Sequence, residues 1–124
     1  MSVVVDASVV LAWLQNEPGA DEAEPMLLEG IIGAANWSEV LQKARQHGAP
    51  AEIVGRLLAS FGLTVTDMTR VDGEVAADLW RPGTNLSLAD RLCLALGRRL
   101  DLPIATADAA MADAAGGAAV VLVR

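Results

Sequence analysis

Residues 86–108 read LSLADRLCLALGRRLDLPIATAD, and this stretch decides the fold. Residues 87–100 carry apolar side chains at helical spacing and predict a helix. Residues 103–107 (PIATA) form a short apolar run, which is typical of a buried strand. Two aspartates frame this unit: Asp90 lies at the front of the helix and Asp108 directly follows the strand. A buried strand that follows a helix in this way indicates a parallel sheet covered by helices.

Outward from this unit, short apolar runs alternate with helical patterns along the chain. The predicted strands are residues 2–6, 31–35, 63–68, 103–107 and 118–123. The predicted helices are residues 7–15, 17–30 (opening after Pro18), 36–48, 50–62, 72–80, 87–100 and 108–117. This alternation predicts an α/β fold in three layers, α/β/α, with a central parallel sheet of four to five strands. Right-handed crossovers bring the carboxyl ends of such strands to one edge, which is where ligands of open α/β sheets bind.

Composition limits the class of protein. The 124 residues suit one domain, and a hydrophobic fraction of 53% with 20% charged residues excludes a disordered chain. The net charge of −7 repels nucleic acid at long range, so a phosphate-bearing substrate would need a metal ion or a local basic strip. No apolar run is long enough for a membrane span and no basic signal-peptide region opens the chain, so we expect a cytoplasmic protein with no membrane partner. The single cysteine, Cys93, is expected in the core.

Four acidic residues are expected at the carboxyl edge of the sheet. Asp6 follows the first strand, and Glu39 lies at the start of the helix after the second strand. Asp90 and Asp108 belong to the unit quoted above. Carboxylates so close together would raise one another's pKa unless a cation lay among them. A set of hard oxygen ligands suits Mg²⁺ or Mn²⁺, which can activate water and neutralise charge on a phosphodiester.

Taken singly, each acid also has a structural explanation. Ser87 and Asp90 have the spacing of a capping box, and so do Asn36 and Glu39, with Asn36 as the N-cap. Glu39 and Lys43 are spaced for an i,i+4 ion pair. The other two acids are each placed to cap a helix. Caps have no reason to recur at the carboxyl ends of several parallel strands, whereas a metal site requires that recurrence, so we favour the metal site.

Three blocks carry a family resemblance. VVVDAS (residues 3–8), NWSEVL (residues 36–41) and the stretch quoted first occur in this order, and they resemble the signature blocks of the PIN-domain ribonucleases. Within this family the chain is most similar to the VapC-type toxins of bacterial toxin–antitoxin pairs. The resemblance covers nearly the whole chain and implies a single PIN-like domain over residues 1–124. Its third block is the specific one.

The resemblance implies a particular chemistry and particular partners. It implies one Mg²⁺ or Mn²⁺ site with four acidic ligands, namely Asp6, Glu39, Asp90 and Asp108. Metal-activated water would then hydrolyse RNA, with the hydroxyls of Ser8 and Thr106 beside the site. The expected partners are the RNA substrate and a cognate antitoxin protein. The resemblance, together with the high apolar fraction, also predicts a homodimer.

The chain departs from the family pattern in two places. Behind Asp108, where the family often carries an aromatic residue, residues 109–119 offer only Met111 and small side chains, and residues 48–80 match only generically. The other polar residues near the motifs are expected to be solvated or to complement helix ends. These residues are His47, Arg91, Arg98, Arg99 and Asp113. Of the arginines, Arg91 is the better placed to contact phosphate.

Two alternative functions compete with the ribonuclease hypothesis. A non-catalytic or RNA-processing PIN domain would bind RNA, but such domains typically lose one or more of the acids, and all four are present here. A phospho-receiver domain needs adjacent acids after its first strand and a lysine late in the chain. Asp6 stands alone and the single lysine is Lys43, so we reject this alternative.

Overall fold

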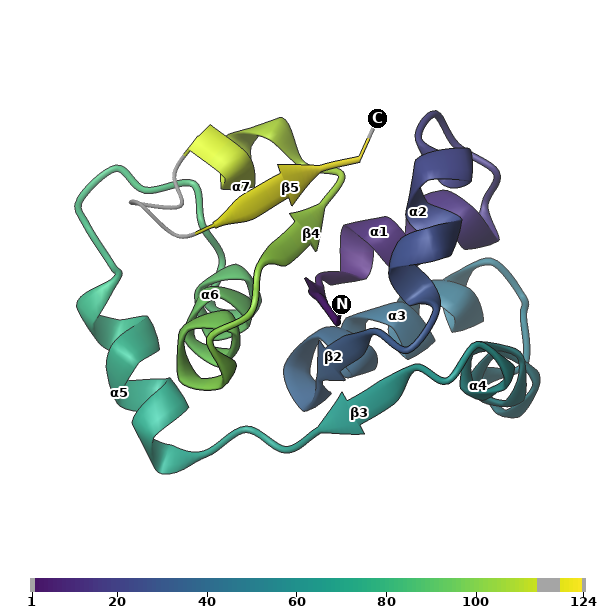
Figure 1. Ribbon diagram of the computed structural model, residues 1–124, viewed down its shortest axis with the longest axis horizontal. Coiled ribbons are helices and arrows are strands. Elements are labelled where there is room, and N and C mark those ends of the chain that lie inside the picture. Colours follow the sequence, from purple (N-terminus) through teal and green to yellow (C-terminus); the bar gives the residue numbers. More distant parts are fainter. Residues whose placement is uncertain (1, 114–118, 124) are drawn as a thin grey trace.

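A five-stranded parallel sheet forms the centre of the molecule in the computed structural model, which describes residues 2–113 and 119–123 (Figure 1). The strands are β1 (Val4–Val5), β2 (Ile31–Gly33), β3 (Thr64–Thr66), β4 (Ile104–Thr106) and β5 (Val120–Leu122). Their order in the sheet is β3-β2-β1-β4-β5, and every neighbouring pair is parallel. The predicted α/β/α fold with a parallel sheet is therefore confirmed, with five strands.

Helices cover both faces of this sheet, as the alternation of strand and helix patterns predicts. They are α1 (Ala7–Leu14), α2 (Ala20–Leu27), α3 (Ala34–Gln46), α4 (Ala51–Ser60), α5 (Arg70–Asp78), α6 (Leu88–Leu100) and α7 (Ala109–Asp113). Successive residues of a strand point to opposite faces. Val5 accordingly packs in the core under α1 to α4, whereas Val4 packs with Ile104 under α6 and α7. Both valines are fully buried, so the central strand is apolar on both sides.

The strand order places a topological switch point between β1 and β4. From β1 the chain winds outward to β2 and β3, then returns across the sheet to β4 and winds outward to β5. In open α/β sheets, ligands bind outside the carboxyl ends of the strands at this point. Asp6 directly follows β1, and Asp108 lies two residues beyond the end of β4. The sheet therefore brings two of the four predicted acids to either side of the switch point.

Helix α6, which carries Asp90, is closely packed against the sheet. A Cβ atom at Gly97 would lie 2.6 Å from side-chain atoms of Ile104, so only glycine allows this approach of α6 to β4. Cys93 is fully buried on the same helix. Burial, followed by the charges of the nearby carboxylates, raises the pKa of its thiol well above the usual range. Cys93 is a core residue, as predicted.

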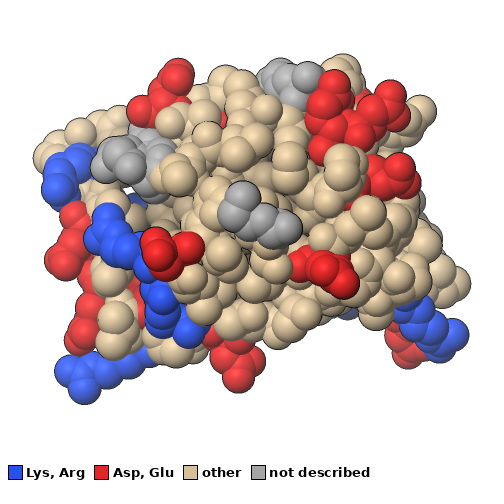
Figure 2. Space-filling model, in the orientation of Figure 1, with Lys and Arg blue, Asp and Glu red and all other residues tan. Residues whose placement is uncertain are grey.

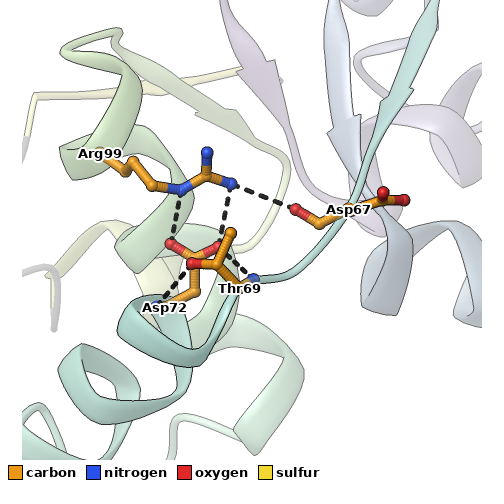
Figure 3. A network of polar contacts seen from close by, with 4 residues as sticks. All are labelled: Asp67, Thr69, Asp72 and Arg99. Carbon is orange, nitrogen blue, oxygen red and sulfur yellow. Dashed lines mark hydrogen bonds and ion pairs between the residues drawn. The ribbon is translucent and has the colours of Figure 1, made fainter.

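An ion pair fixes the other side of α6 to α5 (Figure 3). The Arg99 side chain donates to both carboxylate oxygens of Asp72, at 2.9 and 3.0 Å, and to the carbonyl of Asp67 at 3.1 Å. Asp72 is 1% exposed and also forms a capping box with Thr69 at the start of α5. The prediction that Arg99 only complements a helix C-terminus is wrong. Its partner lies 27 residues away and becomes a neighbour only through tertiary packing.

The start of α3 also differs from the prediction. The helix begins at Ala34, directly after β2, and its N-cap is Gly33 rather than Asn36. The predicted capping box between Asn36 and Glu39 is therefore wrong, because Asn36 lies inside the helix with its side chain buried. The predicted strand over residues 31–35 correspondingly ends at Gly33.

Other boundaries differ by two or three residues: α2 spans Ala20–Leu27 rather than residues 17–30, and α5 spans Arg70–Asp78 rather than residues 72–80. Two predicted helix starts are confirmed. Ser87 and Asp90 form the predicted capping box of α6, and Pro50 precedes the first residue of α4. The last part of the predicted helix 108–117 lies outside the described residues, where α7 extends to Asp113. Within residues 2–113 and 119–123, no helix has the length and hydropathy that a membrane crossing requires.

Candidate active site

Asp6 is the most buried of the predicted acids, at 3% exposed. It is the N-cap of α1, where its Oδ1 accepts a hydrogen bond from the Val9 amide at 3.2 Å. Two hydroxyls also donate to it: Ser8 to Oδ1 at 2.5 Å and Thr106 to Oδ2 at 2.6 Å. Burial raises the pKa of Asp6, these three hydrogen bonds oppose that rise, and the charge of Asp90 adds to it. The side chain is thus held in one orientation, at a cost in electrostatic free energy.

The predicted hydroxyl residues link β1 to β4 through Asp6. Ser8 Oγ accepts from the Ala107 amide at 2.9 Å, and Thr106 Oγ1 accepts from the Asp108 amide at 3.0 Å. Each hydroxyl therefore donates to the carboxylate and accepts from the backbone beyond β4. This arrangement fixes the switch point and orients Asp6 by contacts from both strands.

Glu39 lies in the second turn of α3 and is held by Asn36. The Asn36 side-chain amide donates to Glu39 Oε1 at 3.1 Å and to the carbonyl of Ala89, on α6, at 3.4 Å. Burial raises the pKa of Glu39; the bond from Asn36 opposes this rise, Asp90 adds to it, and Lys43 opposes it. The predicted ion pair between Glu39 and Lys43 is absent from the ion pairs of the described residues.

Asn36, predicted as a helix cap, instead contacts the carboxylate group through Glu39. It is 1% exposed, and its Oδ1 is buried without a hydrogen-bond partner in the described part of the chain. A buried amide oxygen of this kind costs free energy unless a water or a ligand satisfies it. Its position three residues before Glu39 was the available signal, because residues so spaced share a helix face.

Asp90 combines a structural and an electrostatic role. Its Oδ2 accepts from the Ser87 amide at 3.1 Å, and its own amide donates to Ser87 Oγ at 3.1 Å. Its charge also raises the pKa of both Asp6 and Glu39. These three carboxylates, which come from β1–α1, α3 and α6, therefore lie close enough to interact.

Asp108 lies at the same edge but is exposed. Its Oδ1 accepts from the Ala110 amide at 2.9 Å, which caps the short α7, and its connection to Asp6 runs through Thr106. The structure thus gathers Asp6, Glu39 and Asp90 into one electrostatically coupled group and places Asp108 beside it.

The donor chemistry of this group fits a hard divalent cation. The described residues contain no cluster of three or more His, Cys, Asp or Glu side chains already arranged around one metal position. Mg²⁺ does not need such a cage, because it retains several waters and binds through one or two carboxylates. Glu39, Asp90 and Asp108 each have a second carboxylate oxygen without a hydrogen bond from the described residues. A cation here would also relieve the repulsion from Asp90, which adds to the rise that burial causes in the pKa of Asp6 and Glu39.

The fold and the site define the class: a parallel α/β protein with interacting carboxylates at the switch point of its sheet. Sequence comparison identifies the family. The model of the PIN domain family matches residues 3–117. The chain belongs to the PIN domain family. Comparison with curated protein sequences gave no match.

Solved structures show the same fold at low sequence identity. A toxin–antitoxin complex from Klebsiella pneumoniae matches with a TM-score of 0.76 and 22% identity over 98% of both chains. VapC20 from Mycobacterium tuberculosis, described as a toxin that cleaves the sarcin–ricin loop, matches with a TM-score of 0.76 and 16% identity over 98% of both chains. VapBC2 from Rickettsia felis, bound to a fragment of its promoter DNA, matches with a TM-score of 0.73 and 12% identity over the full length of both chains.

Proposed function

We propose that this chain is a metal-dependent endoribonuclease that hydrolyses RNA phosphodiester bonds as the toxin of a type II toxin–antitoxin pair. The observation that carries the proposal is the coupled group of Asp6, Glu39 and Asp90 at the switch point of a PIN-domain sheet. Three carboxylates held close together repel one another, and a bound cation relieves that repulsion. Membership of the PIN family and the toxin–antitoxin proteins among the structural neighbours also support the proposal.

Different side chains would bind the metal ion and position its ligands in such a site. Asp6, Glu39, Asp90 and Asp108 would hold Mg²⁺ or Mn²⁺, which when bound supplies a water of lowered pKa and neutralises charge on the phosphodiester. Ser8 and Thr106 keep Asp6 in place through the hydrogen bonds described above. Asn36 orients Glu39 and ties α3 to α6. Positioning of this kind is a large part of how metal sites are tuned.

Exposed apolar side chains support the proposal that this chain binds other proteins. Four of the described residues are apolar and more than two-fifths exposed: Ile53 and Leu57 on α4, Val71 at the start of α5, and Trp80, two residues beyond the end of α5. Exposed apolar area on a small domain is typical of interfaces. We therefore propose a cognate antitoxin protein and a second copy of the chain as partners, with cytoplasmic RNA as the substrate. Light scattering at micromolar concentration tests the dimer, and a strict monomer would refute it.

Cleavage of RNA tests the catalytic proposal. We expect the purified chain to cut RNA with Mg²⁺ or Mn²⁺ and to lose this activity in excess EDTA. The Asp6→Asn variant should be inactive in both conditions. Undiminished cleavage in EDTA, or cleavage by Asp6→Asn at the wild-type rate, would contradict the proposal.

A further inference from the structure

A groove between α1 and α3 opens beside the carboxylates. It encloses about 380 Å³, and its walls include Ser8, Lys43, His47 and Ala107. Ser8 Oγ donates to Asp6 and accepts from the Ala107 amide, so these two wall residues also hold the buried acid. The groove therefore begins at the candidate active site. It extends along α1 to Gln15, about 10 Å away at the rise of an α-helix.

Lys43 supplies a cation in this groove. It is the single lysine of the chain, its side chain is exposed, and its charge opposes the rise in the pKa of Glu39. Among the described residues it forms no ion pair. Most of the arginines, by contrast, are engaged with carboxylates or backbone carbonyls: Arg56, Arg70, Arg81, Arg91 and Arg99. Among the described residues, the structure thus leaves an unpaired cation in the groove, one helical turn from Glu39.

The charge distribution makes this position unusual. On the face in Figure 2, the Lys and Arg side chains lie mainly over α5 and α6 and are interspersed with Asp and Glu, while the end near α2 is acidic. A chain with a net charge of −7 attracts an anion only through a local cation. Arg45 lies two residues from Lys43, but it lines other hollows, on the side of α3 away from α1.

His47 adds an aromatic surface one turn along α3 from Lys43. Its Nδ1 donates to the Lys43 carbonyl at 2.9 Å, which anchors the ring at the C-cap of the helix. The ring lines the groove and is exposed. Imidazole faces stack on unpaired bases in proteins that bind single-stranded RNA. A cation and an anchored ring therefore lie one helical turn apart on the wall of one groove.

We propose that the α1–α3 groove binds the RNA strand next to the phosphodiester that is cleaved. The Lys43 ammonium contacts a phosphate and the His47 ring contacts a base, while Glu17 at the far end of the groove limits the affinity. This inference rests on the proposed ribonuclease function, because it names the substrate-binding part of the same site. His47 is the exposed C-cap of α3, as predicted, and the proposal adds a contact between its ring and a base.

Fluorescence anisotropy with a short fluorescein-labelled single-stranded RNA tests this groove. Binding is measured in EDTA, where no cleavage is expected, over a series of salt concentrations. Lys43→Gln removes one phosphate contact, so the slope of log K against log[salt] should fall by about 0.7 and the affinity at 0.1 M salt by about fivefold. His47→Ala should weaken binding by about fivefold or more without changing that slope. Glu17→Gln should tighten binding.

Arg45→Gln is the matched control, because it removes a cation from the same helix outside the groove. It should bind RNA like the wild type, apart from a small effect at low salt. Equal losses of RNA affinity in Lys43→Gln and Arg45→Gln would show nonspecific electrostatic attraction and would overturn the proposed binding groove. No measurable binding by the wild type, or binding of polyglutamate as tight as that of RNA, would also overturn it.

The cleavage assay separates this inference from the proposed function. A wild-type chain that cuts RNA with Mn²⁺, while Lys43→Gln and His47→Ala bind and cut RNA normally, would refute the groove alone. A chain that binds RNA through Lys43 but never cuts it would refute the ribonuclease and support a binding function for this groove.

Discussion

Replacing Asp90 with asparagine separates its role as a helix cap from a role in metal binding. Both hydrogen bonds of the capping box, each 3.1 Å long, survive in Asp90→Asn, because an amide oxygen also accepts from the Ser87 amide. The lost charge near the helix N-terminus costs about 0.3–1 kcal/mol. Burial is the main cause of the raised pKa of Asp6 and Glu39, and the charge of Asp90 adds to it; removing that repulsion works in the opposite direction. We therefore expect the free energy of unfolding without metal to change by less than about 1 kcal/mol, which is a Tm change below about 4 °C.

Activity and metal binding should change far more than stability. If Asp90 helps to hold a cation, Asp90→Asn should lose at least about 100-fold in cleavage, the upper range for residues that only orient metal ligands. It should also lose most of the rise in Tm that Mn²⁺ gives the wild type, since a ligand stabilises the folded state by RT ln(1 + [L]/Kd), which shrinks as the affinity falls. Carboxyl NMR titration should show lower pKa values for Asp6 and Glu39 in the variant, because Asp90 raises both.

Asp101→Asn is the matched control for this experiment. Asp101 ends the same helix, is exposed, and adopts the left-handed conformation (φ 53°) that asparagine tolerates. Its melting temperature, its response to Mn²⁺ and its cleavage rate should remain those of the wild type. An Asp90→Asn protein that melts clearly lower, still gains stability from Mn²⁺ and still cuts RNA would show that Asp90 is only a cap.

Three further predictions follow from single contacts. Asn36→Ala removes a hydrogen bond that lowers the pKa of Glu39. NMR should therefore show a higher pKa for Glu39, and the rate of RNA cleavage should fall about 10–100-fold. An unchanged pKa of Glu39 would contradict this contact. Gly97→Ala should lower the free energy of unfolding by about 1–3 kcal/mol, less any gain in helix propensity, because its Cβ would lie 2.6 Å from the Ile104 side chain. Gly73→Ala, whose Cβ would have no atom within 4 Å, should raise it by about 0.5–1 kcal/mol. Urea unfolding measures both. Burial raises the pKa of Asp72, but the hydrogen bonds from Arg99 and Thr69 outweigh it and lower that pKa. The Asp72 carboxylate therefore stabilises the fold above its unfolded pKa of about 3.9, and this stability disappears as the pH falls through its lower folded pKa. Asp72→Asn should flatten the acid limb of a Tm-against-pH curve.

The alternation of elements could be predicted from the sequence because parallel strands buried on both faces are short apolar runs. Val4 and Val5 belong to opposite cores, so no polar residue interrupts β1 before Asp6. The start of α6 was equally clear, since Ser87 and Asp90 have the residue types and spacing of a capping box directly before the apolar helical pattern. Local chemistry determined both features, and local chemistry can be read from sequence.

The errors arose where one spacing fits two structures. Asn36 and Glu39 match a capping box as well as two positions on one helix face, and the difference depends on where the chain turns after β2. The pairing of Asp72 with Arg99 depends on how α5 packs against α6, which no local pattern encodes. Lys43 has the spacing for an ion pair with Glu39, yet the carboxylate is oriented by Asn36 instead. Tertiary packing determines which side chains pair with one another in a site.

In this fold, one carboxylate can be a helix cap and a metal ligand at the same time, although the two roles look like alternatives in the sequence. Asp6 and Asp90 both cap helices, and a cap uses one or two lone pairs of a carboxylate that has about four. A helix N-terminus also carries partial positive charge, which offsets part of the cost of holding several carboxylates together before a cation arrives. The helices that start at the carboxyl edge of the sheet can therefore hold the acids in place with the same bonds that begin the helices. For this reason an isosteric amide, which preserves the cap and removes the charge, is a more informative variant at these positions than alanine.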